Sequence, residues 1–320
     1  MTAYVIANFG GPRSLPEVEP FLRSLFTDRE VFRTKIPSPF FQWLFGRIAK
    51  KRTLSVCKDY AEIGGGSPIY EDTEFVAQRL RERLDGEVLT FHRYLPVTHS
   101  TFLQKIETLD VQRIRVFPMF PQFTYATTGS IAKFFSQKLS HSTLLKLRWI
   151  KSYPTHPSFI SLTQKMIGEA ELNMRETILF FSAHGLPQRF VDEGDVYKDE
   201  CIASVNEVKK AFPEALSHLG YQSKVGRAVW LEPSTISLCQ NIDTWGKGRK
   251  NVLFVPISFT SDHIETLFEV EREYMPVVCE KGFVVRRLPA FNRREEWIET
   301  IIKILYNETT LSNAMLVRNR

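Results

Sequence analysis

Strand-like and helix-like segments alternate along almost the whole chain, and this alternation limits the fold more than any other feature. Short apolar runs typical of buried strands are separated by stretches of helical periodicity. The order strand, helix, strand, helix predicts parallel sheets covered on both faces by helices. The predicted strands lie at 4–7, 89–91, 114–117, 147–150, 177–181, 251–257 and 283–286. The predicted helices lie near 15–26, 71–84, 98–107, 129–140, 156–169, 196–211, 234–242 and 262–275.

The chain length sets the number of cores. Its 320 residues exceed what one hydrophobic core usually holds. Two sheets of about four strands each fit this length better than one very wide sheet. The run Tyr153-Pro154-Thr155-His156-Pro157 breaks the pattern, so the domains are predicted at 1–152 and 153–292. A helical pattern over 293–306 could pack back on the first domain, and the polar residues 307–320 are expected to fray.

Composition and charge exclude several classes of protein. The 43% hydrophobic and 24% charged contents are those of a soluble globular protein. No apolar run approaches the ~20 residues that span a bilayer, and residues 1–8 lack the basic start of a signal peptide, so we expect a cytoplasmic protein. The net charge of +6 comes from dispersed basic residues without a recognisable nucleic-acid motif. This favours an anionic small molecule or a lipid surface over nucleic acid as the partner.

Two segments follow predicted strands and carry the chemistry. Residues 181–187 read F-S-A-H-G-L-P, and residues 256–273 read P-I-S-F-T-S-D-H-I-E-T-L-F-E-V-E-R-E. In an open α/β sheet, ligands bind just beyond the carboxyl ends of the strands. We therefore expect one edge of a sheet to present His184 opposite a second histidine, His263, and a series of carboxylates.

The carboxylates are regularly spaced. Glu265, Glu269 and Glu273 recur at i, i+4 and i+8, which places them near one stripe of a helix, and a local π-bulge would align them further. The alternative is a solvated acidic face, with Asp262 as the N-cap and Glu265 as its capping-box partner. Nitrogen and oxygen ligands without thiolate suit Fe²⁺, Co²⁺ or Zn²⁺ equally well. The spacing indicates a metal without identifying it.

His184 stands at a predicted strand end. A lone histidine there is more often a structural residue than a catalyst. Here Gly185 and Pro187 turn the chain sharply and are expected to expose the ring. Histidine is also the side chain best suited to accept protons near neutral pH.

The stretch Val31 to Arg52 combines many aromatic residues with a basic edge. One interpretation is a core helix with charged ends. The other is a flap that covers a flat apolar anion or rests on a membrane surface. Its adjacent aromatics and two prolines favour a flap over a regular amphipathic helix.

Taken together, these motifs resemble those of the ferrochelatases, which insert ferrous iron into a porphyrin. The matches are N-F-G-G-P at 8–12, Y-A-E-I-G-G-G-S-P-I at 60–69, P-Q-F-T-Y-A-T-T-G-S at 121–130, F-S-A-H-G-L-P at 181–187, Q-S-K-V-G at 222–226 with Trp230, and F-T-S-D-H-I-E-T-L-F-E at 259–269. The resemblance implies a chelatase-like α/β fold. Its two Rossmann-like domains would each hold a parallel four-stranded sheet, with a porphyrin cleft between them.

The resemblance also implies roles for particular residues. His184 would take the pyrrole protons or bind the incoming metal, with Glu265 as its partner across the cleft. These two would be the catalytic residues, and Glu269 and Glu273 would form an acidic conduit behind them, so that all four contact the metal. The porphyrin pocket would comprise Phe9, Tyr60, Arg93, Trp230, Phe259 and His263, with Arg52 and Ser223 at the propionates.

The resemblance further bears on substrate and cofactor. Relatives that act on coproporphyrin III place a tyrosine where this chain has Phe9, so protoporphyrin IX is expected as the partner of Fe²⁺. The animal enzymes bind an iron–sulfur cluster through C-terminal cysteines. This chain has no cysteine after Cys279 and carries Tyr125 at the remaining ligand position, so we expect no cluster and no cofactor beyond substrate Fe²⁺.

Several alternatives stay open at this point. A coproporphyrin ferrochelatase, a cobalt or sirohydrochlorin chelatase, and a non-catalytic tetrapyrrole-binding protein share much of the expected pocket. We expect a monomer, with peripheral contact to the inner membrane through 31–52.

Overall fold

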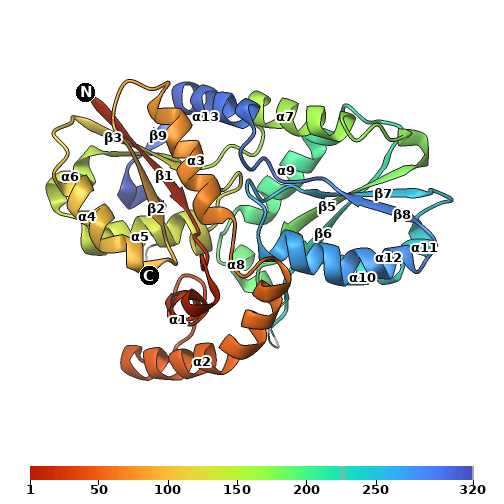
Figure 1. Cartoon of the computed structure of the whole chain (residues 1–320), viewed down its shortest axis with the longest axis horizontal. Coiled ribbons are helices and arrows are strands. Elements are labelled where there is room, and N and C mark those ends of the chain that lie inside the picture. The colour runs from red at the N-terminus through yellow and green to blue at the C-terminus, as the bar shows by residue number, and fades with distance from the viewer. Residues whose placement is uncertain (225, 227, 319–320) are drawn as a thin grey trace. The chain divides into compact units, whose positions relative to one another are not determined.

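The computed structural model describes residues 1–224, 226 and 228–318, which form two compact units. Unit 1 comprises Met1–Ser152 with Ile301–Arg320, and unit 2 comprises Tyr153–Thr300. Helix α13 (Glu295–Asn307) begins in unit 2 and continues into unit 1. In both units strands and helices alternate in the chain (Figure 1), so the predicted α/β class is confirmed. Within the described residues, no helix is long and apolar enough to cross a bilayer.

The sheet of unit 1 has the strand order β2-β1-β3-β4-β9. Its strands are β1 (Thr2–Asn8), β2 (Val88–His92), β3 (Arg113–Pro118), β4 (Leu147–Ile150) and β9 (Thr310–Leu311). The first four are parallel, and β9 pairs antiparallel with β4. The prediction of four strands was therefore one too few for this sheet, since the chain end adds a fifth.

Besides the end of α13, the described part of unit 1 contains the α-helices α1 (Val18–Phe26), α2 (Ser38–Glu62), α3 (Ile69–Arg81), α4 (His99–Glu107), α5 (Ser130–Lys138) and α6 (His141–Lys146). Helix α3 packs on β1 and β2 through Val76, Ala77 and Leu80, which are fully buried and recur at helical spacing. Strand β1 is buried almost throughout, as expected for the centre of a parallel sheet.

The expected flap over 31–52 was wrong for most of its length. From Ser38 the chain forms the regular helix α2, which packs against α1 (Figure 1). The two prolines do not interrupt it, because Pro37 precedes the helix and Pro39 lies in its first turn. The first-turn amide hydrogens have no helical acceptor, so proline costs little there.

The expected fraying of 307–320 was also wrong as far as the described residues extend. Beyond α13, Leu311 pairs with Trp149, and Asn313 is buried at 4% exposure. The side-chain oxygen of Asn313 accepts a hydrogen bond of 3.0 Å from the Trp149 indole, and its amide donates to the Ala132 carbonyl at 2.9 Å. These bonds satisfy buried polar groups, which is why this polar segment is ordered. Residues 319–320 lie outside the described residues.

The sheet of unit 2 has the order β6-β5-β7-β8, with all neighbours parallel. Its strands are β5 (Thr177–His184), β6 (Leu216–Gln222), β7 (Asn251–Pro256) and β8 (Val284–Arg287). Strand β6 was not predicted, because its sequence L-S-H-L-G-Y-Q has no apolar run. The chain leaves β5 toward β6 on one side and returns to β7 on the other. The point where this order reverses, beside β5 and β7, is where such sheets bind ligands.

The helices of unit 2 are α7 (Pro157–Gly168), α8 (Gln188–Asp192), α9 (Tyr197–Lys209), α10 (Thr235–Gln240), α11 (Ile242–Trp245) and α12 (Met275–Cys279). A π-helix over Glu265–Tyr274 precedes α12 directly. Phe180 and Phe254, from the middle of β5 and β7, stack at 4.7 Å in a core that α10 and α12 cover.

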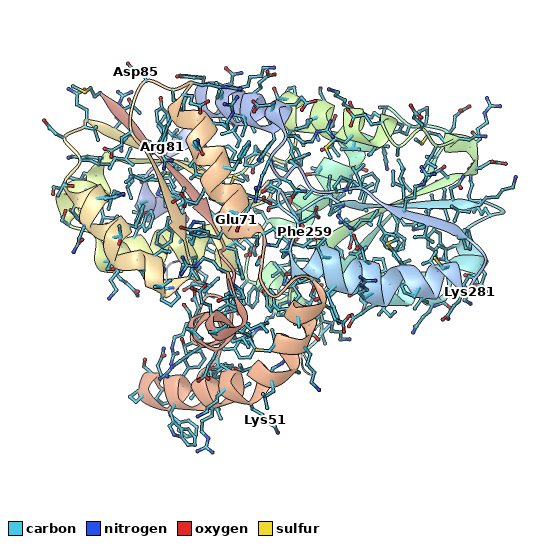
Figure 2. The ribbon with its side chains drawn as sticks, in the orientation of Figure 1. Lys51, Glu71, Arg81, Asp85, Phe259 and Lys281 are labelled. Carbon is cyan, nitrogen blue, oxygen red and sulfur yellow. The ribbon has the colours of Figure 1, made fainter. Side chains whose placement is uncertain are left out.

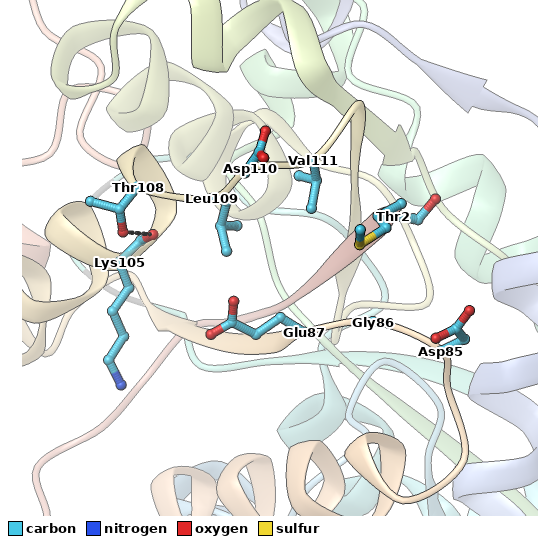
Figure 3. A pocket seen from close by; sticks show the side chains of 10 residues that line it. Thr2, Asp85, Gly86, Glu87, Lys105, Thr108, Leu109, Asp110 and Val111 are labelled. Carbon is cyan, nitrogen blue, oxygen red and sulfur yellow. Dashed lines mark hydrogen bonds between the residues drawn. The ribbon is translucent and has the colours of Figure 1, made fainter.

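A cavity of about 330 Å³ lies at the amino-terminal edge of the unit 1 sheet (Figure 3). It is lined by residues of the loops before β2 and β3, among them Gly86, Glu87 and Asp110. Ligands of parallel α/β sheets bind at the opposite, carboxyl edge. The cavity therefore takes no part in the candidate site.

Candidate active site

His184 is the last residue of β5, in register with Gln222 at the end of β6. The chain then turns at Gly185, whose amide donates to the Gln222 carbonyl at 2.9 Å. A Cβ atom at Gly185 would lie only 2.5 Å from that carbonyl oxygen, so the turn requires glycine. The side chain of His184 stays 37% exposed, as the sequence predicted from this turn.

His184 and Glu265 are direct partners. The Nδ1 atom of His184 lies 2.7 Å from Oε2 of Glu265. The expectation that they face each other across a cleft was wrong, since both belong to unit 2 and are hydrogen-bonded. The reason is the strand order: β7 lies next to β5, so the π-helix that follows β7 starts at the edge where β5 ends. Because a carboxylate can only accept, Nδ1 carries the hydrogen, and Nε2 is left as the basic nitrogen.

Three donors converge on one oxygen of Glu265. Besides His184, the Ser223 hydroxyl lies 3.0 Å and the Gln222 amide nitrogen 3.3 Å from Oε2. The other oxygen, Oε1, has only a longer contact of 3.6 Å with Nε2 of His263 among its described neighbours. Nδ1 of His263 lies 3.1 Å from the Ser261 carbonyl and so carries a hydrogen. Oε1 of Glu265 and Nε2 of His184 are therefore the atoms best placed to meet a proton or a cation.

The three spaced glutamates lie on the π-helix and form a gradient of exposure. The Glu265 side chain is 19% exposed, Glu269 is half-buried and Glu273 is exposed. A π-turn is wider than an α-turn and brings residues at this spacing closer to one line, so the stripe that the spacing predicts is compatible with the π-helix. The alternative of a capping box was wrong, because the Asp262 carboxylate accepts from Arg287 at 2.7 Å instead of capping the helix.

Ser223 lies between two of these carboxyl groups. Its hydroxyl oxygen is 2.6 Å from Oε2 of Glu269 and 3.0 Å from Oε2 of Glu265, and its backbone has a φ of 65°. A hydroxyl has one hydrogen, so it can donate to one carboxyl group and must accept from the other. One of the two glutamates is therefore expected to carry a proton. The Tyr274 hydroxyl, 3.3 Å from Oε2 of Glu269, adds a further donor.

The electrostatics assign that proton to Glu269. Burial and the negative charge of Glu265 raise the pKa of Glu269 to about 8. Burial would also raise the pKa of Glu265, but the charge and hydrogen bond of His184 outweigh it and hold that pKa below its usual range. Burial lowers the pKa of His184, and the charge and hydrogen bond of Glu265 more than reverse this, so that pKa is raised. Near neutral pH the site thus combines an ionised Glu265, hydrogen-bonded to His184, with a protonated Glu269.

Three further predicted pocket residues lie in unit 2. Trp230 pairs with Pro187 next to the His184 turn, and its ring approaches to 3.2 Å from the Cβ position of Gly185. The ring of Phe259, marked in Figure 2, packs at a tilt against that of His263, with 4.6 Å between the ring centres. His263 is buried at 9% exposure. Aromatic side chains therefore lie near the His184 turn and next to His263, whose ring contacts Glu265.

The other predicted pocket residues lie in unit 1. Phe9 follows β1 directly, half-buried, with its ring edge-on to Tyr94 at 4.5 Å. The guanidinium of Arg93 donates to Asp28 at 2.6 Å, so this arginine already has a carboxylate partner. Arg52 is exposed on α2, whereas Tyr60, near the end of that helix, is buried at 2% exposure.

Metal binding by His184, Glu265, Glu269 and Glu273 stays a prediction. Among the described residues, no three histidine, cysteine, aspartate or glutamate side chains are grouped closely enough to hold a metal ion. His184 and Glu265 each use one atom to bind the other, which leaves one ligand atom on each side chain.

The sequence did not identify Gln222, Ser258 and Tyr274 as site residues. The Ser258 hydroxyl accepts from the His184 amide at 3.2 Å, and the other two contact the glutamates. Gln222 opens the quoted match at 222–226, of which Val225 lies outside the described residues, but with β6 unrecognised nothing placed it beside His184. No sequence pattern marks Ser258 or Tyr274.

Two parallel α/β units and a histidine–carboxylate pair at a strand-order reversal define a chelatase-like protein. Among solved structures, SirB from Bacillus subtilis with Fe3+ is similar at a TM-score of 0.53 and 9% identity, over 96% of both chains. DR2241 from Deinococcus radiodurans is similar at a TM-score of 0.52 and 11% identity, over 98% of this chain, which spans 56% of that chain. At these identities the likeness concerns the fold alone.

Sequence relatives establish the family. The sequence model of the ferrochelatase family matches residues 1–309. Ferrochelatases of Chlamydia caviae and Chlamydia abortus are 43% and 41% identical over 323 residues, covering all of both chains, and that of Chlamydia trachomatis serovar D is 39% identical. The chain belongs to the ferrochelatase family, which confirms the resemblance. It is accordingly a lyase that inserts iron.

We predict that Glu269→Gln changes how stability depends on pH. The raised pKa of about 8 means that the folded chain holds an extra proton between the pKa of an unfolded glutamate, about 4.3, and pH 8. The contribution of the Glu269 carboxyl group to the free energy of unfolding is therefore lost as the pH rises from about 4.3 to about 8. Glutamine does not titrate. As the pH rises from 5 to 8.5, the melting temperature of the variant should therefore increase relative to that of the wild type, on the order of a few °C.

Thermal unfolding followed by circular dichroism measures this difference. Glu273→Gln, on the exposed end of the same π-helix, is the matched control and should show little change with pH. A constant offset for Glu269→Gln across the pH range would mean that Glu269 is an ordinary ionised carboxylate.

Proposed function

We propose that the chain inserts Fe²⁺ into protoporphyrin IX to give protohaem, with release of two protons. The observation that carries this proposal is the hydrogen bond from His184 Nδ1 to Glu265, which turns Nε2 into a base at a partly exposed position. Family membership supplies the iron-insertion chemistry. The choice of protoporphyrin rests on Phe9, an apolar ring where coproporphyrin relatives carry a tyrosine.

The pair is suited to removing pyrrole protons. A porphyrin must lose two weakly acidic N–H protons as a dication enters. Nε2 of His184 would accept a proton, and the adjacent Glu265 carboxylate would stabilise the imidazolium that forms. The raised pKa of His184 makes its neutral form the stronger base.

The glutamate series offers the proton a way out. Ser223 bridges Glu265 and Glu269, and Glu273 lies exposed further along the same helix. Once Glu269 has released its own proton to solvent, a proton that reaches Glu265 could pass through the Ser223 hydroxyl to Glu269. An arriving Fe²⁺ would favour the ionised carboxylates, so metal entry and proton release would be linked.

Binding of the porphyrin would use both aromatic and basic side chains. In unit 2, Trp230, Phe259 and His263 would contact the ring. For unit 1, the half-buried Phe9 is the better suited of the two predicted aromatic residues, because Tyr60 is only 2% exposed. The exposed guanidinium of Arg52 could pair with a propionate. Ser223 suits this role poorly, since a propionate would bring a third carboxylate to Glu265 and Glu269. Arg93 could contribute only by exchanging or sharing its bond with Asp28.

We also propose that no cofactor is needed beyond substrate Fe²⁺. An iron–sulfur cluster requires several thiolates in one place. Cys201 and Cys239 are buried thiols, and burial raises the pKa of Cys239 to about 12, which keeps it protonated. Iron and acid-labile sulfide analysis of the purified protein tests this, and stoichiometric sulfide would overturn it.

Peripheral membrane contact through 31–52 remains part of the proposal. Phe40 and Trp43 are each 54% exposed on α2 and stack at 5.5 Å. The guanidinium of Arg47 lies over the Trp43 ring, and Lys51 projects from the same helix (Figure 2). An apolar surface with adjacent cations suits the interface of an anionic bilayer.

The first prediction from this proposal concerns the substrate. Anaerobic turnover with Fe²⁺, followed by loss of free-base absorbance, should be faster with protoporphyrin IX than with coproporphyrin III. The reverse preference would keep the chelatase chemistry and refute the argument from Phe9. Tight porphyrin binding without insertion of any divalent metal would leave a tetrapyrrole carrier instead.

A second prediction concerns the base. His184→Ala should lower insertion at least ~100-fold, because the proton acceptor is lost, while porphyrin affinity measured by fluorescence stays within a few fold. His218→Ala is a matched control, since His218 packs on Trp245 away from the glutamates. Turnover equal to that of the control would remove His184 from the mechanism.

A third prediction concerns the membrane. The double change Phe40→Ser and Trp43→Ser should weaken sedimentation with phosphatidylglycerol vesicles about tenfold or more, because two exposed rings can no longer insert. Leu145→Ser, which replaces a 62% exposed leucine on α6, is the control. Equal binding of the double variant and wild type would contradict membrane contact through α2.

A further inference from the structure

The side chain of Gln222 is buried at 2% exposure, and both ends of its amide are used. Its nitrogen lies 3.2 Å from the main-chain oxygen of Glu265 and 3.3 Å from Oε2 of the same residue. Its oxygen accepts a hydrogen bond from the hydroxyl of Ser182. The Gln222 side chain thus binds both the main chain and the side chain of Glu265.

The chemistry of the neighbours fixes which way this amide points. A carbonyl oxygen and an ionised carboxylate can only accept hydrogen bonds, so the end that faces Glu265 must be the NH₂ group. The oxygen then faces Ser182, whose hydroxyl can donate to it. A reversed amide would place two acceptors against each other in a buried site, which is costly.

Gln222 also joins three separate elements. Ser182 and His184 are two residues apart on β5 and share one face of that strand. Gln222 ends the neighbouring strand β6, and Glu265 begins the π-helix. The series Ser182, Gln222, Glu265, His184 therefore starts and ends on β5.

From this geometry we propose that Gln222 is a positioning residue for His184, acting through Glu265. By holding Oε2 and the main chain of Glu265, the amide keeps that oxygen directed at Nδ1 and so fixes the tautomer in which Nε2 is the base. Partners of this kind typically alter activity about 10–100-fold when removed. The inference deepens the proposed function and rests on it for its kinetic consequences, but the tautomer itself is a property of the substrate-free protein.

Gln222→Leu tests the proposal, because it removes both hydrogen bonds to Glu265 while the volume of the side chain stays nearly constant. We expect kcat/KM for iron insertion to fall about 10–100-fold with unchanged porphyrin affinity. In the metal-free protein, ¹⁵N–¹H NMR should show the His184 ring moving from the Nδ1–H tautomer toward a mixture, with His184→Ala used to assign the signals.

The matched control is Gln164→Leu. Gln164 also donates to two acceptors, the carbonyls of Glu207 and Val208, but it lies on α7 and joins that helix to α9. This variant should leave the His184 signals and the insertion rate as in wild type, which separates positioning from a general loss of stability.

Gln222→Leu leaves the Ser182 hydroxyl without its acceptor, and the variant could fail to fold. The double change Ser182→Ala with Gln222→Leu removes both partners, which is far less costly than leaving one of them unpaired. His184 signals and kcat/KM equal to wild type in the folded variant would overturn the inference. Failure of the wild-type protein to insert iron would refute the proposed function alone, since the NMR comparison would still decide the role of Gln222.

Discussion

The hydrogen bond between His184 and Glu265 is the interaction on which the rest of the site depends. A partly buried carboxylate and a partly buried imidazole each lose hydration, and the hydrogen bond compensates for this loss only while the two stay in contact. The surrounding residues preserve that contact. Gly185 lets the chain turn close to β6, while Gln222 and Ser223 hold the same oxygen that His184 binds.

The same interaction sets the charge of the next residue. Because Glu265 stays ionised beside His184, a second negative charge at Glu269 is unfavourable, and Glu269 keeps a proton near neutral pH. Ser223 can then donate to one glutamate and accept from the other. A cation in the site would reverse this preference. Under the proposed function, metal entry would therefore be accompanied by release of the proton from Glu269.

The sequence could predict the elements better than their arrangement. Alternating patterns predicted most strands, but β6 was not predicted because its sequence has no apolar run. Spacing placed the three glutamates on one helix, yet the contact between His184 and Glu265 depends on β5 and β7 being neighbours, which is a tertiary fact. Ser223 shows the same limit. The resemblance suggested a propionate contact, whereas its backbone at a φ of 65° and its hydroxyl between two glutamates are visible only in the structure.

The two units apply one architecture to different tasks. Apart from β9, the two sheets have the same strand order, β2-β1-β3-β4 in unit 1 and β6-β5-β7-β8 in unit 2. In each sheet the direction of strand addition therefore reverses beside the strand that comes first in the chain, β1 or β5. In unit 1 that strand is followed by Phe9, whose amide is held by the Asn8 side chain at 2.7 Å and whose ring packs on Tyr94. In unit 2 the equivalent edge carries His184 and its carboxylate. An aromatic ring offers apolar contact but no proton transfer, so under the proposed function His184 and Glu265 would carry the acid–base chemistry and Phe9 would serve apolar recognition.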